Sequence, residues 1–208
     1  MVSVGPPHAS GRDELSSLVA PALAGEPAAL EGLLVAVGPS LLRVSRQILG
    51  PDHPDVEDVV QESAFALIEA LRDFRGDSSV LHFACRVALL TAMNTRRKLR
   101  VRERLTPISN DAVLDELAGG GPLPSADLVA ARRRRAVGEL LSELPAPQAE
   151  ALALHCVLGF TVSETAVACA VPENTVRSRL VTAKAALKKR LGDDATLREE
   201  LELAKGAG

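Results

Sequence analysis

The chain has 208 residues, enough for one large or two small domains, and its apolar fraction of 47% is typical of a globular protein. Aromatic residues make up only 2%, with no Trp and no Tyr, so the cores must be built from Leu, Val and Ala, and Leu and Ala favour helix. The formal net charge of −3 excludes a basic field over the whole surface, so a nucleic-acid role would have to rest on local clusters of cations.

Residues 1–25 carry Gly, Pro and Ser without sustained periodicity, and they predict a flexible leader that can end in a short helix. This leader lacks the charged and apolar regions of a signal peptide. No apolar run approaches the roughly 20 residues of a membrane span. We therefore expect a cytoplasmic protein without membrane insertion.

A first helical domain is predicted over residues 26–104. Apolar residues recur at helical spacing from Pro27 to Leu49, where Gly38 and Pro39 can divide the helix in two. The same periodicity continues from Asp55 to Leu71, in a helix whose first turn is acidic, as the helix dipole favours.

The first domain then continues through a loop at Phe74 to Ser79. Ser78 or Ser79 can cap a further helix that runs to about Arg104. Residues 105–127 follow, with three consecutive glycines and three prolines, and this composition predicts a flexible linker.

A second domain over residues 128–193 is predicted to contain a helix-turn-helix, ahead of a C-terminal tail at 194–208. Thr161 is placed to cap one helix, with Glu164 three residues later as in a capping box. Pro172 marks the start of the next helix. In that helix Val176, Leu180, Ala183 and Leu187 share one face, and cations lie on the rest.

The same residues could form an amphipathic hairpin whose cations are merely solvated. Agreement between the cap, the proline start and the basic cluster favours instead a recognition helix suited to the major groove of DNA.

The sequence gives little support for disulfide bonds, metal binding or catalysis. Cys85, Cys156 and Cys169 sit in apolar helical sequence, where thiols usually act as small buried hydrophobes, and they suggest no disulfide framework. His82 and Cys85 have the spacing of two metal ligands, but no second pair accompanies them. We expect no metal, no cofactor and, for want of a catalytic constellation, no enzyme.

Several segments together carry a resemblance to a known family. They are Val56-Glu57-Asp58-Val59-Val60-Gln61-Glu62, Phe74-Arg75-Gly76-Asp77-Ser78-Ser79, Gly159-Phe160-Thr161, Val171-Pro172 and Thr175-Val176-Arg177-Ser178-Arg179-Leu180. In this order the chain resembles the extracytoplasmic-function (ECF) group of bacterial sigma-70-type factors, which direct RNA polymerase to promoters. The resemblance implies an all-α fold of two small domains, region 2-like and region 4-like, joined by the linker.

The resemblance also implies partners and site residues. The partners would be core RNA polymerase, promoter DNA and, in some members, an anti-sigma protein. The linker would thread the RNA path of the polymerase. The polymerase would contact Glu57, Asp58, Gln61 and Glu62. The −10 element would contact Phe74, Ser78, Ser79, His82, Phe83 and Arg86. The −35 element would contact Asn174, Thr175, Arg177, Ser178, Arg179, Thr182 and Lys184.

The chain departs from the family pattern at positions that matter for promoter melting. Phe83, Leu89 and Leu90 replace a usual Trp and an Arg-Asn pair, and Ala170 replaces the turn glycine. A working sigma factor is the leading hypothesis. The alternatives are a degenerate regulator that binds polymerase or an anti-sigma protein without opening promoters, and a stand-alone helix-turn-helix regulator, which leaves the acidic helix and the linker without a purpose.

Overall fold

The computed structural model describes residues 14–105 and 136–193, and every regular element within these ranges is helical. The expected all-α fold is therefore confirmed. The predicted linker, apart from residue 105, and the predicted tail lie outside the described residues, so their boundaries stay predictions.

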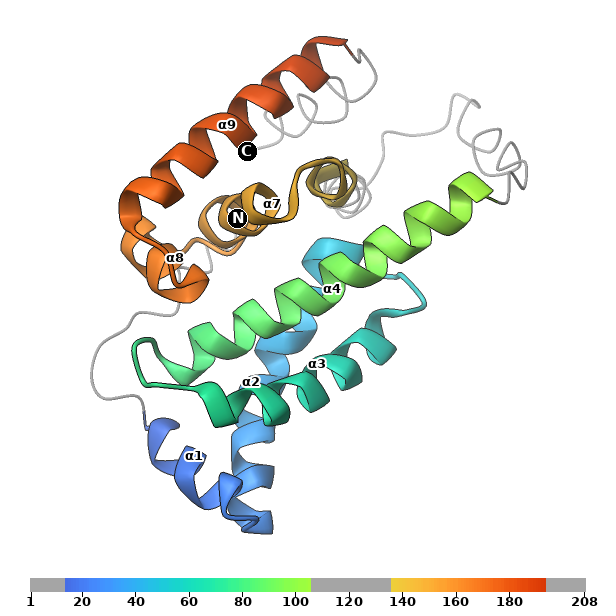
Figure 1. Ribbon diagram of the computed structural model, residues 1–208. Coiled ribbons are helices and arrows are strands. Elements are labelled where there is room, and N and C mark those ends of the chain that lie inside the picture. The colour runs from blue at the N-terminus through green and yellow to red at the C-terminus, as the bar shows by residue number, and fades with distance from the viewer. Residues whose placement is uncertain (1–13, 106–135, 194–208) are drawn as a thin grey trace, which may run out of the picture.

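The first unit is built from four helices around one core (Figure 1). Its central helix is α2, which packs against α1, α3 and α4. A short 3-10 turn, η1, continues the end of α3. The bounds are Ser16–Leu23 for α1, Pro27–Leu49 for α2, Val56–Ala70 for α3, Leu71–Asp73 for η1 and Val80–Leu105 for α4.

The helix α2 is continuous, so the expected break at Gly38 and Pro39 is wrong. Pro39 lacks the N–H that an interior helical residue donates, but it is exposed, on the side of α2 that faces solvent. The buried side, which includes Leu33, Val37 and Leu41, holds the helix together across this point. Packing of the buried face outweighs the tendency of Gly38 and Pro39 to break the helix.

By length and mean hydropathy, α2 could also cross a membrane, which corrects the expectation that no apolar run approaches that length. Core helices of soluble proteins meet the same criterion. Here Leu33, Val37, Leu41, Val44 and Ile48 are almost fully buried against the other helices of the first unit. The position of α2 in the core is sufficient reason for its apolar sequence.

The second unit packs α9 across α7 and α8 (Figure 1). Residues 136–143 are helical, and Pro145 ends that segment and precedes α7. The chain then passes through one π-helical turn, η3, into the helix-turn-helix. The bounds are Ala146–Leu152 for α7, Ala153–Val157 for η3, Val162–Cys169 for α8 and Glu173–Asp193 for α9.

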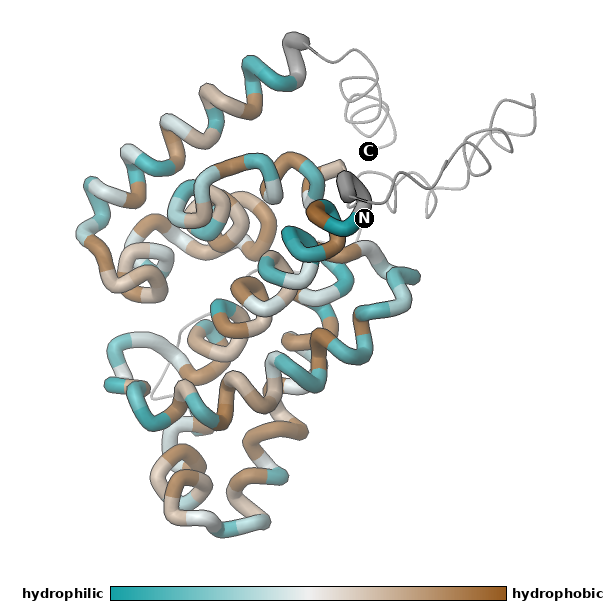
Figure 2. The backbone as a smooth tube through the Cα atoms, turned by 45° about the vertical axis from the view of Figure 1, so that its right-hand side comes forward, coloured by the Kyte–Doolittle hydropathy of each residue, from teal (hydrophilic) through white to brown (hydrophobic). Residues whose placement is uncertain are grey.

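The two units form one continuous buried cluster, with α4 between them (Figure 1). One side of α4 packs on α2 and α3, and the opposite side contacts η3 and α8. Figure 2 shows hydrophilic and apolar residues alternating along α9, as expected for a helix with one buried face. The second unit is thus docked on α4 rather than held apart from it.

Candidate nucleic-acid and polymerase surfaces

The helix-turn-helix begins with the predicted capping box. The Thr161 hydroxyl accepts a hydrogen bond from the Glu164 backbone N–H at 3.1 Å, and the Glu164 carboxylate accepts from the Thr161 N–H at 2.8 Å. Gly159, with φ of 79°, makes the sharp turn before the cap. His155 Nδ1 donates to the Phe160 carbonyl at 2.6 Å and fixes the same turn. The start of α8 is therefore set by local sequence.

The turn between α8 and α9 contains a backbone conformation that alanine disfavours. Ala170 has φ of 53° and ψ of 45°, the left-handed region. This conformation costs an L-residue about 1–2 kcal/mol. The N–H of Val171 donates to the carbonyl of Ala166 at 3.0 Å, and the Pro172 carbonyl accepts from Thr175 at 2.9 Å. These bonds hold the turn despite the missing glycine.

The recognition helix α9 buries one face and presents the other. Val176, Leu180 and Ala183 are buried as the periodicity predicts. All seven residues predicted to read the −35 element lie on α9, and they fall into two groups. Asn174, Arg177, Ser178, Thr182 and Lys184 are exposed, whereas Thr175 and Arg179 are half-buried.

The two arginines of this helix have different surroundings. The Arg177 guanidinium donates to Glu173 Oε2 at 2.7 Å and to Asn174 Oδ1 at 3.2 Å, near the start of α9. Arg179 lies close enough to the Cys169 thiol at the end of α8 to act on it electrostatically. Arg177 thus lies in the first turns of α9, the part of a recognition helix that usually reaches base edges, and Arg179 lies beside α8.

Sequence reasoning missed one residue on this face. Val181 is 69% exposed and lies three and four residues after Ser178 and Arg177. Its exposure could have been predicted, because the helical periodicity that buries Val176 and Leu180 places Val181 on the outer face. An exposed apolar side chain among these polar groups suits a thymine methyl group.

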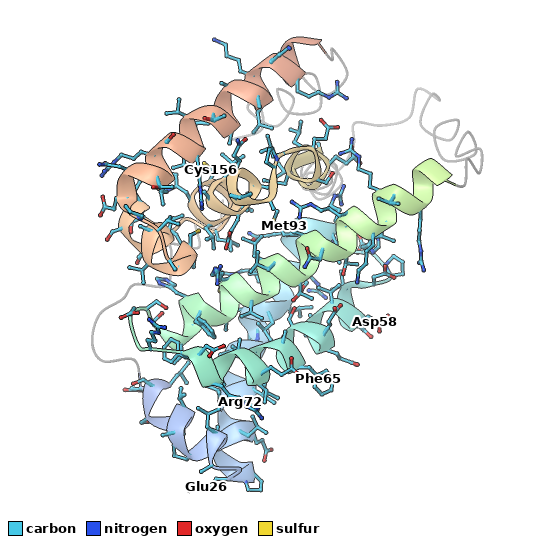
Figure 3. The ribbon with its side chains drawn as sticks, viewed as in Figure 1. Glu26, Asp58, Phe65, Arg72, Met93 and Cys156 are labelled. Carbon is cyan, nitrogen blue, oxygen red and sulfur yellow. The ribbon has the colours of Figure 1, made fainter. Side chains whose placement is uncertain are left out.

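The four polar residues predicted to bind polymerase share one exposed face of α3. Glu57, Asp58, Gln61 and Glu62 are all exposed. Phe65, which sequence reasoning did not include, continues this face at 68% exposure. Figure 3 shows Asp58 and Phe65 projecting from α3. The face therefore combines carboxylates with one large apolar side chain.

A groove of about 480 Å³ borders the same face, between α3 and the last turns of α4. One wall is acidic and the other basic. The lining residues are Asp55 at the N-cap of α3, Asp58, Val59 and Glu62 from α3, and Thr95, Lys98, Leu99 and Arg102 from α4.

The residues predicted for the −10 element are divided between two environments. Phe74 in the loop packs on Phe83 of α4, with ring centroids 5.1 Å apart, and both are half-buried. Ser79 caps α4, since its hydroxyl accepts from the His82 backbone N–H at 3.1 Å. The Ser78 hydroxyl lies 3.4 Å from the Ser79 carbonyl. These four residues lie together at the start of α4.

His82 and Arg86, by contrast, are covered by the second unit. The His82 ring is 3% exposed, and its centroid lies 4.2 Å from that of the Phe160 ring. Its Nε2 atom has no hydrogen-bond partner among the described residues. Arg86 Nε donates to Glu150 Oε1 at 2.8 Å. The family resemblance assigned both side chains to the −10 element. No short-range pattern reveals these contacts with the second unit, which join residues more than 60 positions apart.

The apolar replacements at the melting positions pack into the protein. Leu89 is fully buried in the core and Leu90 is half-buried. Core packing thus accounts for Leu89, and neither side chain supplies a polar group to unpaired bases.

The three cysteines differ in solvent exposure. Cys85 is buried, but Cys156 is exposed, which corrects the expectation that all three are small buried hydrophobes. Burial raises the pKa of the Cys85 thiol. Burial, aided by the Glu150 charge, raises the pKa of Cys169 to about 11. Among the described residues, no group of three or more His, Cys, Asp or Glu side chains could hold a metal ion.

Comparison with known proteins places both units in one family. The family model for sigma-70 region 2 matches residues 33–102, and that for sigma-70 region 4 matches residues 134–187. The RNA polymerase sigma factor CnrH of Cupriavidus metallidurans is 30% identical over 181 residues, which cover 85% of this chain and 94% of CnrH. The ECF RNA polymerase sigma-E factor of Escherichia coli K12 is 32% identical over 144 residues, 66% of this chain and 74% of that protein.

The fold agrees with these relatives. The structure of CnrH in complex with the cytosolic domain of CnrY matches with a TM-score of 0.51 at 23% identity, over 88% of this chain and 99% of CnrH. Both family models match in the order that the sequence resemblance implies. The chain belongs to the sigma-70 family of RNA polymerase sigma factors, in its ECF group.

Proposed function

We propose that this protein binds core RNA polymerase and directs it to start transcription at specific promoters. The observation that carries the proposal is the presence, on one chain, of two distinct surfaces: the acidic face of α3 and the capped helix-turn-helix with its exposed basic helix α9. The protein would act by positioning the polymerase and would not be an enzyme itself. Its place of action would be the cytoplasm.

The region 4-like unit, with proposed bounds 128–193, would read the −35 element with α9 in the major groove. Arg177 and Asn174, near the start of the helix, would reach base edges, since arginine pairs with guanine and asparagine with adenine. Arg179 and Lys184 would contact phosphates, which orient the protein without reading sequence. Val181 would add an apolar contact between them.

The region 2-like unit, with proposed bounds 26–104, would bind the polymerase through the α3 face. Carboxylates steer a basic partner surface and fix its register, and a large apolar side chain supplies the buried centre of an interface. Asp58, Gln61 and Glu62 would therefore surround Phe65 at the contact. The mixed-charge groove beside α4 would widen that surface.

The start of α4 would hold the −10 element. A base extruded from the stack needs an aromatic or apolar surface and hydrogen-bonding groups. The adjoining Phe74 and Phe83 rings would offer the surface, and Ser78 the hydroxyl. Since Ser79 is engaged in capping α4, its role would be to position this loop.

An anti-sigma protein is a further proposed partner. The relative CnrH was solved with the cytosolic domain of CnrY bound. Its similarity to this chain extends over nearly its whole length. A comparable regulator would bind this chain.

Co-purification with core polymerase tests the proposal. The variant Asp58→Ala/Gln61→Ala, and separately Phe65→Ala, should each lower the yield of the complex at least fivefold. The matched control Glu26→Ala/Glu31→Ala changes exposed residues of α2 and its cap and should leave the yield unchanged. Equal yields for all variants would remove α3 from the contact.

A further inference from the structure

A second cleft lies between the last turns of α4 and the helical segment 136–143 of the second unit (Figure 1). Its volume of about 530 Å³ is within the range of small-molecule sites. The described residues that line it are Arg97, Arg100 and Val101 of α4, and Ser142 and Glu143 of the second unit. By helical phase, these α4 residues lie on the opposite side of the helix from the groove that α3 borders.

Arg97 supplies a positive charge in this cleft that no described carboxylate neutralises. The residue is half-buried, and it has no hydrogen bond or ion pair with another described residue. The neighbouring Arg100, by contrast, donates to Glu143 Oε1 at 2.6 Å. A half-buried guanidinium is partly stripped of water, so an anion that pairs with it is held more strongly than at an open surface. Arg97 is therefore available to an external anion.

The other wall of the cleft offers acceptors that arginines hold in place. Glu143 accepts from Arg100 through Oε1 and from Arg190 of α9 through Oε2, at 2.6 and 3.2 Å. The Ser142 hydroxyl accepts from Arg100 at 2.8 Å. Because each carboxylate oxygen has two lone pairs, Glu143 can accept a further hydrogen bond from a hydroxyl or amino group. This wall suits the uncharged, hydrogen-bonding part of a ligand.

The net charge and an apolar side chain narrow the class of ligand. Arg97, Arg100 and Arg190 carry three positive charges and Glu143 carries one negative charge, which leaves a net charge of +2. A phosphomonoester carries a charge of about −1.5 to −2 at pH 7. Val101 is 55% exposed, so it offers an apolar surface to a ring, and a guanidinium can stack on the same ring.

We propose that this cleft binds a nucleoside phosphate. The phosphate pairs with Arg97, the sugar hydroxyls donate to Glu143, and the base packs against Val101. Inorganic phosphate would gain only the Arg97 contact and would be repelled by Glu143, so the nucleoside part is needed for binding. The inference goes beyond the proposed function, since the ligand is a small molecule and the site lies outside the surfaces assigned to polymerase and promoter.

The site depends on the spacing of its two walls. Gly138 lies one helical turn before Ser142, and a Cβ atom there would overlap the Ile48 carbonyl oxygen and lie 2.8 Å from the Arg96 guanidinium. Gly138→Ala should therefore shift segment 136–143 relative to α4 without changing any residue that lines the cleft. Its control is Gly38→Ala, whose added Cβ meets no atom within 4 Å.

Saturation-transfer NMR on the full chain at low salt tests the proposal, with adenosine 5′-monophosphate (AMP) as the probe. AMP should bind with a Kd below about 1 mM, and adenosine and inorganic phosphate should each bind at least about tenfold more weakly. Arg97→Gln should weaken AMP binding at least about fivefold. Its control, Arg46→Gln, removes the same charge from an exposed site on α2 and should leave binding unchanged.

Two further variants separate a built site from a merely basic surface. Glu143→Gln removes the charge that repels inorganic phosphate, so it should narrow the preference for AMP over inorganic phosphate. Gly138→Ala should abolish AMP binding, whereas Gly38→Ala should not. Circular dichroism would verify that each variant keeps its helix content.

Any of four results would overturn the proposal. They are no AMP binding by the parent protein, equal AMP affinity of Arg97→Gln and Arg46→Gln, equal affinity of the parent for AMP and inorganic phosphate, and unchanged AMP binding by Gly138→Ala. A 12-nucleotide oligodeoxythymidine that displaces AMP and binds more tightly would also overturn it, because Arg97 would then belong to a nucleic-acid surface.

Discussion

Ala170 shows how a single residue limits the stability of the DNA-reading unit. It adopts the left-handed conformation between α8 and α9 and is the one non-glycine residue with positive φ in the part of the chain that the structure describes. Alanine pays a steric cost there that glycine does not. The family's usual glycine at this position thus has a direct physical reason.

Ala170→Gly should stabilise the protein by about 0.5–1 kcal/mol, because the steric relief exceeds the extra entropy of glycine in the unfolded chain. The control Ala185→Gly, at an exposed interior position of α9, should instead destabilise it by about 1 kcal/mol. Urea unfolding followed by circular dichroism would measure both. A destabilised Ala170→Gly variant would contradict the strained turn.

The three thiols should react in a definite order. Only the thiolate is nucleophilic, and Cys169, with a pKa of about 11, stays protonated at pH 8. Cys156 is exposed, and Cys85 is buried with a raised pKa. Iodoacetamide at pH 8 should therefore modify Cys156 first, Cys169 slowly and Cys85 only after unfolding, as mass spectrometry of timed samples would show. Equal labelling of Cys156 and Cys169 in the folded protein would contradict this order.

At the scale of elements, α9 supports a prediction about DNA. Arg177→Ala should weaken binding of a duplex from the protein's own upstream region about tenfold, or about 1.4 kcal/mol. Arg46→Ala, which removes the same charge from an exposed site on α2, serves as control and should have little effect. If Arg177 contacts phosphate, the loss should shrink as salt rises. Equal affinities of Arg177→Ala and the parent at low salt would refute the role.

The elements also show which features a sequence can predict. The capping box of α8, the buried stripe of α9 and the Ser79 cap of α4 are set by neighbours within four residues, and all were predictable. The continuity of α2 through Pro39 could not be predicted, because it depends on burial of the opposite face of the helix in the core. Candidate surfaces on α3 and α9 followed from helical phase, although Phe65 and Val181 were overlooked.

For the molecule as a whole, the contacts between the two units could not be predicted from the sequence. Glu150 and Phe160 have no sequence feature that pairs them with Arg86 and His82, since each contact joins distant segments through packing alone. These contacts nevertheless decide which of the proposed promoter residues are accessible. Loop Phe74 to Ser79 stays open, whereas the next turns of α4 are covered.

We expect this chain to turn core polymerase into a promoter-specific enzyme. Purified core polymerase with this protein should make abortive transcripts from the protein's own upstream region, and permanganate should detect unpaired thymines near the start site. Core polymerase alone should do neither. Polymerase binding without reactive thymines or transcripts would contradict the claim and favour a regulator that, with Leu89 and Leu90 at the melting positions, does not open DNA.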